Sequence, residues 1–81
     1  MDAMEAVKTA AAAAGVPTTH IGPAMGKRSN YVSAIVSRGS TPQADTLAAM
    51  LAPCGYVLAA VPCDQVPAGA LVIDAPAPPR A

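Results

Sequence analysis

The 81-residue sequence contains no Trp and no Phe, and its only aromatic residues are Tyr31 and Tyr56. A hydrophobic core must therefore be built from Ala, Val, Leu, Ile and Met. A chain this short buries only about 60% of the surface that its unfolded form exposes, so the core of a monomer is marginal. We expect one globular unit that needs a supplement such as a disulfide, a metal or oligomerisation.

Metal ligands and nucleophiles are scarce. Cys54 and Cys63 form no CxxC pair, and His20 is the only histidine. This set is too small for a common zinc site, so no metal or cofactor is predicted. Two reduced thiols are the favoured state, with an internal disulfide as the alternative. Neither His20 nor Cys54 has a base and an orienting group at recognisable spacing, so an enzyme is not predicted.

The sequence also lacks the signals of secretion and of membrane insertion. Its first residues are acidic (Asp2, Glu5), whereas a signal peptide opens with basic ones. The Ala-rich run is interrupted by Lys8 and ends at Gly15, which is too short to span a bilayer. These features predict a cytoplasmic protein with no membrane partner.

One segment of the chain, residues 17–44, contains no negatively charged residue. Residues 17–44 contain Lys27, Arg28 and Arg38 and no Asp or Glu, giving +3, so the remainder carries −3 in a chain of net charge zero. A local patch of this size can bind a polyanion, because phosphate contacts act locally by releasing counterions. Solvated charge that merely keeps the protein soluble explains the patch equally well.

Apolar spacing and Gly/Pro punctuation predict four helices. In the first, Met4, Val7, Ala11 and Ala14 share one face, and Gly15 is a natural stop. Pro23 predicts that the second helix is short or kinked, because proline removes one helical hydrogen bond. The expected ranges are 2–14, 17–26, 30–38 and 43–52.

The pattern changes after Gly55. Residues 55–61 and 70–74 are short and rich in strand formers, and turn residues separate them, which predicts a β-hairpin or paired strands. Residues 75–81 are Pro-rich and predict an extended tail. The expected fold is mostly α, with a helical domain over 1–55, the β-segment over 56–74 and the tail over 75–81.

The second and third predicted helices, joined by a turn around Gly26, form a helix-turn-helix pattern. The third helix begins near Ser29 and Asn30 and exposes Ser33, Ala34 and Ser37. Small polar side chains suit a helix in a DNA major groove, where Asn can pair with adenine and Ser can contact several bases.

On these residues the chain resembles the lambda-repressor-like, Cro-type (XRE) helix-turn-helix proteins of phages and bacteria. The resemblance spans residues 3–55. It is carried by Ile21-Gly22, Met25-Gly26, Ser29-Asn30-Tyr31-Val32-Ser33, Pro42, Thr46-Leu47 and Gly55. The chain departs from the family pattern at Thr18, where Gln is usual, at Gly22-Pro23, and at Arg38-Gly39, which is displaced by one residue.

The resemblance implies a regulator that binds double-stranded DNA. The implied base contacts are Arg28, Ser29, Asn30, Ser33 and Ala34, and the implied backbone contacts are Thr18, Lys27, Tyr31 and Arg38. Structural roles remain open for three of them: Ser29 as an N-cap, Tyr31 as a cover for the core edge, and Arg38 as a complement to the helix C-terminus.

The apolar C-terminal segment predicts a partner, because an isolated hairpin is marginal in water. We expect a homodimer, which would place two recognition helices about 34 Å apart on DNA. The expected interface residues are Val57, Leu58, Val61, Leu71, Val72 and Ile73. Two alternatives stay open: a hairpin folded onto its own helices, and a protein-interaction module such as an antitoxin that binds a toxin.

Overall fold

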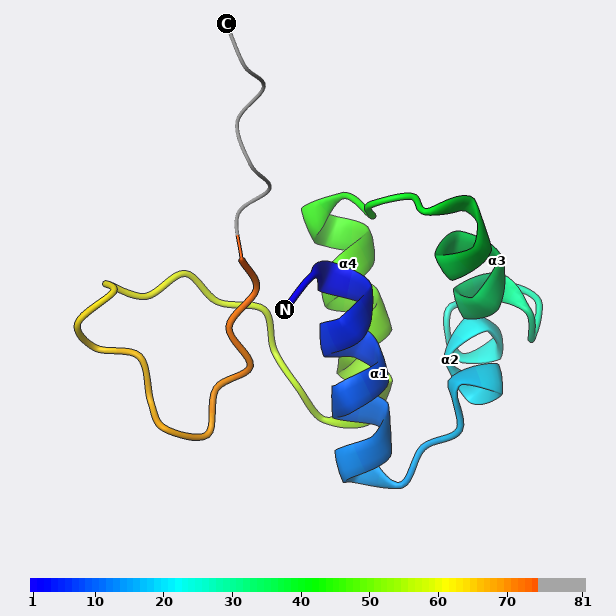
Figure 1. The fold of residues 1–81 in the computed structure, drawn as a ribbon. Coiled ribbons are helices and arrows are strands. Elements are labelled where there is room, and N and C mark those ends of the chain that lie inside the picture. The colour runs from blue at the N-terminus through cyan, green and yellow to red at the C-terminus, as the bar shows by residue number, and fades with distance from the viewer. Residues whose placement is uncertain (75–81) are drawn as a thin grey trace, which may run out of the picture.

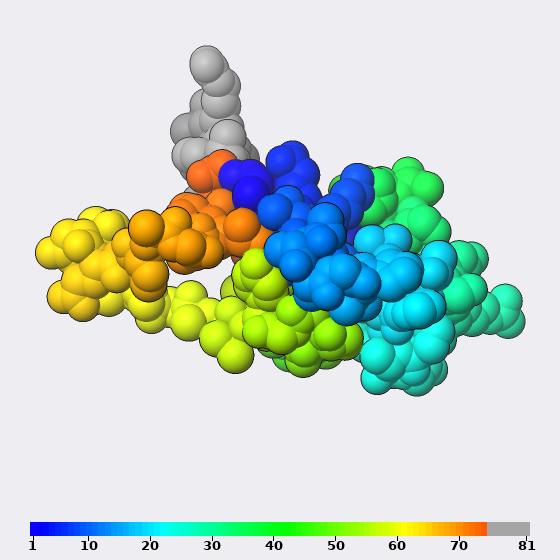
Figure 2. Space-filling view, turned by 90° about the horizontal axis from the view of Figure 1, so that it is seen from below, coloured from blue at the N-terminus to red at the C-terminus, as the bar shows by residue number. Residues whose placement is uncertain are grey.

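The computed structural model describes residues 1–74, which contain four α-helices, a 3₁₀ turn and no β-strand (Figure 1). The elements are α1 (Ala3–Ala14), α2 (Thr18–Ala24), α3 (Tyr31–Arg38), α4 (Ala44–Leu51) and η1 (Ala52–Cys54). The mostly helical prediction is confirmed, and the four helices fall within the expected ranges. Figures 1 and 2 both place α1 and α4 centrally, between the α2–α3 pair and the segment that follows η1.

Local signals set both ends of α1. The Asp2 carboxylate accepts a hydrogen bond of 2.8 Å from the Glu5 N–H and caps the first turn. Gly15 ends the helix at φ 69°, a left-handed conformation that glycine adopts without a steric penalty. The chain between them buries the face that carries Met4, Val7 and Ala11.

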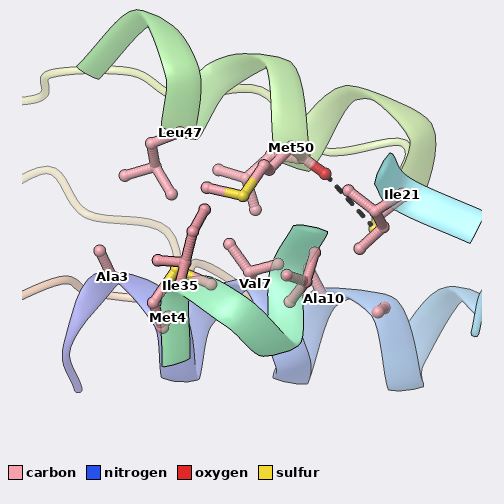
Figure 3. Packing of buried hydrophobic residues seen from close by; sticks show 12 residues of the cluster. Ala3, Met4, Val7, Ala10, Ile21, Ile35, Leu47 and Met50 are labelled. Atoms are coloured by element: carbon pink, nitrogen blue, oxygen red, sulfur yellow. Dashed lines mark hydrogen bonds between the residues drawn. The ribbon is translucent and has the colours of Figure 1, made fainter. Parts of the chain in front are cut away.

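The core lies where α1 and α4 meet the α2–α3 pair (Figure 3). Val7, Ile21 and Met50 have no exposed surface, and these are the largest fully buried side chains. Burying such a side chain contributes about 1.5–3 kcal/mol. The remaining core residues are Ala3, Met4, Ala10, Ala11, Val32, Ile35, Leu47, Leu51 and Cys54.

Helix α2 is short, as Pro23 predicts, and it has seven residues. Pro23 lies inside the helix near its C-terminal end and has no amide hydrogen to donate. Two residues further on, the Met25 N–H donates to the carbonyls of Ile21 and Gly22 at 3.2 and 2.9 Å. The helix continues for one residue past Pro23 and ends at Ala24, and Ile21 anchors it to the core because it is completely buried.

The structure does not support the predicted β-hairpin or paired strands, since within residues 1–74 neither 55–61 nor 70–74 forms a strand. Two separate turns lie between them, closed by bonds of 2.9 Å from the Gln65 N–H to the Pro62 carbonyl and 3.1 Å from the Ala70 N–H to the Pro67 carbonyl. The two turns carry the chain through a wide loop (Figure 1), and in the described chain no backbone hydrogen bond joins the two segments.

The end of this loop returns to the helices. Leu71 and Ile73 pack against the core, as in the predicted alternative of a segment folded onto its own helices. The Asp74 N–H donates to the Met1 carbonyl at 2.8 Å, and the Met1 ammonium group meets the Val72 carbonyl at 3.3 Å and the Asp74 carboxylate at 2.6 Å. The predicted tail, residues 75–81, lies outside the described residues. Within residues 1–74 no helix is long and apolar enough to cross a bilayer.

Candidate nucleic-acid interface

Helix α2 approaches the turn before α3 so closely that only glycine fits at position 22. A β-carbon at Gly22 would lie 2.0 Å from the Arg28 carbonyl oxygen and 3.0 Å from the Tyr31 β-carbon. Real β-carbons essentially never come within 3.0 Å of such an atom. The missing side chain therefore determines how near α3 lies to α2.

The turn between the helices is fixed by its backbone. The Lys27 N–H donates to the Gly22 carbonyl at 2.8 Å, and the Gly26 N–H donates to the Pro23 carbonyl at 3.0 Å. Gly26 has φ 74°, which glycine tolerates best. The turn leaves the side chains of Lys27 and Arg28 exposed to solvent.

The start of α3 differs from the predicted one. Ser29 is not the N-cap: Asn30 occupies that position, and its side chain makes no capping hydrogen bond. The first turn is instead closed by the Tyr31 N–H on the Arg28 carbonyl at 3.1 Å and by the Ser33 hydroxyl on the Asn30 carbonyl at 3.0 Å. Capping therefore does not occupy the side chains of Ser29 and Asn30, and both are exposed.

Helix α3 has one buried and one open face. Val32 and Ile35 point into the core, whereas Ser33 and Ser37 are exposed and Ala34 is half-buried. Of the nine predicted DNA contacts, six are exposed: Lys27, Arg28, Ser29, Asn30, Ser33 and Arg38.

The other three predicted contacts, Thr18, Tyr31 and Ala34, are half-buried. Tyr31 packs against the hydrophobic core, as the alternative structural role predicts. Arg38 lies in the last turn of α3, where a cation complements the helix dipole. Both residues thus have structural roles that do not depend on a ligand.

The three cations of this surface have no acidic partner. Within residues 1–74 the only ion pair joins Met1 and Asp74, so Lys27, Arg28 and Arg38 form none. Ion pairing in the described chain therefore does not explain their position. We call these three cations and the open face of α3 the basic face. All of its residues come from the range 17–44, which contains no Asp or Glu.

The residues considered for catalysis do not form a cluster. His20 is exposed on α2, whereas Cys54 is buried and its thiol lies 3.9 Å from the Met50 carbonyl. Burial raises the pKa of the Cys54 thiol, which lowers its nucleophilicity at neutral pH. In the described part of the chain no three His, Cys, Asp or Glu residues lie close enough to hold a metal ion.

Two features of the structure were not predicted from the sequence. One is the close contact at Gly22, whose only sequence signal is a glycine inside a helix. The other is an apolar hollow between α1, α4 and the segment after η1, which depends on tertiary placement.

The sequence matches no protein-family model, and no curated protein or solved structure is significantly similar to it.

Proposed function

We propose that this protein is a cytoplasmic, sequence-specific DNA-binding regulator of the lambda-repressor-like type, in which α2 and α3 form the helix-turn-helix. The observation that carries the proposal is the basic face: three cations that have no acidic partner within residues 1–74, beside an exposed helix surface of small polar side chains. Such a surface has little apolar area to recruit a protein, and its charge favours phosphate.

The dimensions of α3 support this assignment. The eight residues of α3 make about two turns, and the helix diameter of about 10–12 Å fits the major-groove width of about 12 Å. Asn30 and Ser33 carry donors and acceptors suited to base edges, and Arg28 carries a fork of donors suited to guanine. Lys27 and Arg38 lie at opposite ends of α3, where they would contact phosphates on either side.

The regulator would act by occupying its operator, with no covalent chemistry. Selection of random duplex DNA by the purified protein, followed by sequencing of the retained pool, tests this directly. We expect an enriched motif whose binding survives moderate salt. Retention without an enriched motif, lost as salt rises, would show that the basic face binds polyanions only generically and would refute the proposal.

The variant Asn30→Ala then tests whether the Asn30 side chain contacts a base in the operator. We expect this variant to lose about 1–3 kcal/mol of specific affinity, the contribution of one bidentate base contact, with its non-specific affinity unchanged. Lys27→Ala is the contrasting variant: it should weaken specific and non-specific binding alike and reduce the salt slope by about 1. Unchanged operator affinity in Asn30→Ala would remove Asn30 from the interface.

A second candidate function is a protein-interaction module, such as an antitoxin that binds a toxin. The observation in its favour is the apolar segment after η1, where Val57 is 84% exposed. Stable, stoichiometric capture of a different protein by the purified chain would support this alternative. A motif in the DNA selection would favour the regulator.

A further inference from the structure

An apolar hollow lies between the helices and the loop of residues 56–70. Its volume is about 800 Å³, and Leu47, Leu51 and Tyr56 line it on the helical side. Figure 2 shows the loop standing away from α1 and α4, with an opening between them. Pockets that hold small molecules in proteins measure about 300–1,000 Å³, so this hollow has the size of a ligand site.

The loop is attached to the helices at both of its ends. At its start the Tyr56 N–H donates to the Leu51 carbonyl at 3.2 Å, and beyond its end the Asp74 N–H donates to the Met1 carbonyl at 2.8 Å. Leu71 packs against the core between these points. One chain therefore borders the hollow from both sides. A folded partner needs about 800 Å² of open surface on each side, whereas a small molecule needs only the space that the chain encloses.

The lining of the hollow is apolar and uncharged. The loop contributes large side chains that are exposed to solvent, among them Leu58, Val61 and Val66. No Asp, Glu, Lys, Arg or His is among the described residues that line the hollow. A charged ligand would lose its hydration there without gaining an opposite charge, which is costly. The lining therefore favours a molecule that is uncharged and mostly apolar.

The hollow also contains hydrogen-bonding groups. In the described chain no hydrogen bond reaches the amide or carbonyl groups of residues 57–61, and all five of these residues line the hollow. Apolar ligand pockets commonly orient their ligand through a few backbone N–H and C=O groups. A ligand with one or two polar groups can pair with the backbone of 57–61 while its apolar part contacts the side chains.

We propose that this hollow binds an uncharged, mostly apolar small molecule that carries one or two hydrogen-bonding groups. An apolar cavity of about 150 Å³ accommodates benzene, so the ligand contains at most roughly thirty non-hydrogen atoms. Its binding removes the apolar side chains of the loop from water, which supplies the driving force. The proposal depends on the hollow alone, so it holds or fails independently of DNA binding by the basic face.

Fluorescence titration with a matched pair of dyes tests the proposal. N-phenylnaphthylamine is uncharged, and anilinonaphthalene sulfonate carries the same aromatic rings with an added negative charge. We expect the uncharged dye to bind one molecule per chain, at least about ten-fold more tightly than the sulfonate. It should also raise the Tm, because it binds the folded chain, and it should slow labelling of the Cys63 thiol, which lines the hollow.

The variant Val61→Lys tests whether the dye occupies the hollow. Val61 lines the hollow and is 48% exposed, so the far-UV circular dichroism of the variant should be unchanged. The added cation should weaken binding of the uncharged dye several-fold and strengthen binding of the sulfonate. Ala12→Lys, which adds the same charge at an exposed position of α1 outside the hollow, should bind both dyes like the wild type.

Four outcomes would overturn the proposal. The uncharged dye does not bind, or it binds without saturating at one molecule per chain. The two dyes bind equally well, which would show generic adhesion to exposed apolar side chains. Val61→Lys leaves both affinities unchanged, which would place the dye elsewhere. Finally, sedimentation shows a dimer of the chain that excludes the dye, which would mean that a second copy fills the hollow.

Discussion

Replacing Gly22 by Ala is the sharpest test of how α3 is positioned. Alanine is the better helix former by about 1 kcal/mol, so propensity alone predicts that Gly22→Ala stabilises the protein. The structure predicts the opposite sign. The new methyl group would lie 2.0 Å from the Arg28 carbonyl oxygen, and this oxygen must retreat by at least about 1 Å before the contact reaches 3.0 Å.

The magnitude follows from what the retreat disturbs. Overpacking of a tight contact costs about 1–3 kcal/mol. The Arg28 carbonyl also accepts the Tyr31 N–H at 3.1 Å, and losing that hydrogen bond costs about 0.5–1.5 kcal/mol. After subtracting the gain in propensity, we expect a net destabilisation of about 2 kcal/mol, which lowers the Tm of a domain this small by about 8–16 °C.

Thermal and urea unfolding followed by circular dichroism measure this difference. Gly69→Ala is the matched control: the same methyl group is added in the exposed loop, where it meets no atom within 4 Å and φ is not positive. The control should stay within about 0.5 kcal/mol of the wild type. A Gly22→Ala protein as stable as the wild type would refute the close approach of α2 to the turn.

Two further predictions concern titrating groups. The hydrogen bond from the Glu5 N–H lowers the pKa of Asp2. The stability that this bond adds is therefore complete above the ordinary pKa of about 3.9 and is lost as pH falls through the lower folded value. Asp2→Ala should lower the Tm at pH 7, and Asp2→Asn, which keeps an acceptor, should lower it less. Burial raises the pKa of the Cys54 thiol, so the stability that this thiol contributes is complete below the ordinary pKa of about 8.5 and falls as pH rises toward the folded value. This dependence of stability on pH should disappear in Cys54→Ala and persist in Cys63→Ala. A thiol reagent should label native Cys63 well before Cys54.

Helix α1 could be predicted from the sequence because its local signals agree with its tertiary role. Asp2 and Gly15 delimit α1 by capping chemistry alone. Helix α2 could be predicted only in part, since Gly22 and Pro23 both disfavour a helix. Tertiary contacts stabilise the helix, because Ile21 is completely buried and the nearby Arg28 carbonyl oxygen leaves room only for glycine at position 22.

The loop after η1 could not be predicted, because strand-forming residues indicate an extended backbone without naming its partner. Leu71 and Ile73 had the same apolar character in the sequence as Val57 and Val61. In the structure the first two pack on the core and the last two are exposed. Which of them would be buried depends on the two turns at Pro62 and Pro67, and on the pairing of residues 72–74 with Met1.

The candidate site was predictable in composition and less so in geometry. The charge imbalance of residues 17–44 is a property of the sequence, and the described part of the structure gives its three cations no acidic partner. Which side chains of α3 are accessible depends on its rotation about its own axis. Burial of Val32 and Ile35 fixes that rotation, and it leaves Ser33 and Ser37 open while Ala34 and Tyr31 are partly covered.

The two unpartnered surfaces of the chain differ in chemistry, and this difference argues for two separate tasks. The basic face has charge and small polar groups, whereas residues 57–61 have neither charge nor a hydrogen-bond partner in the described chain. Figure 1 places them on opposite sides of α1 and α4. A molecule bound at the loop would therefore leave α3 uncovered. If binding at the loop blocked the proposed DNA binding by α3, the arrangement of the two surfaces around α1 and α4 would have to be different from the one described.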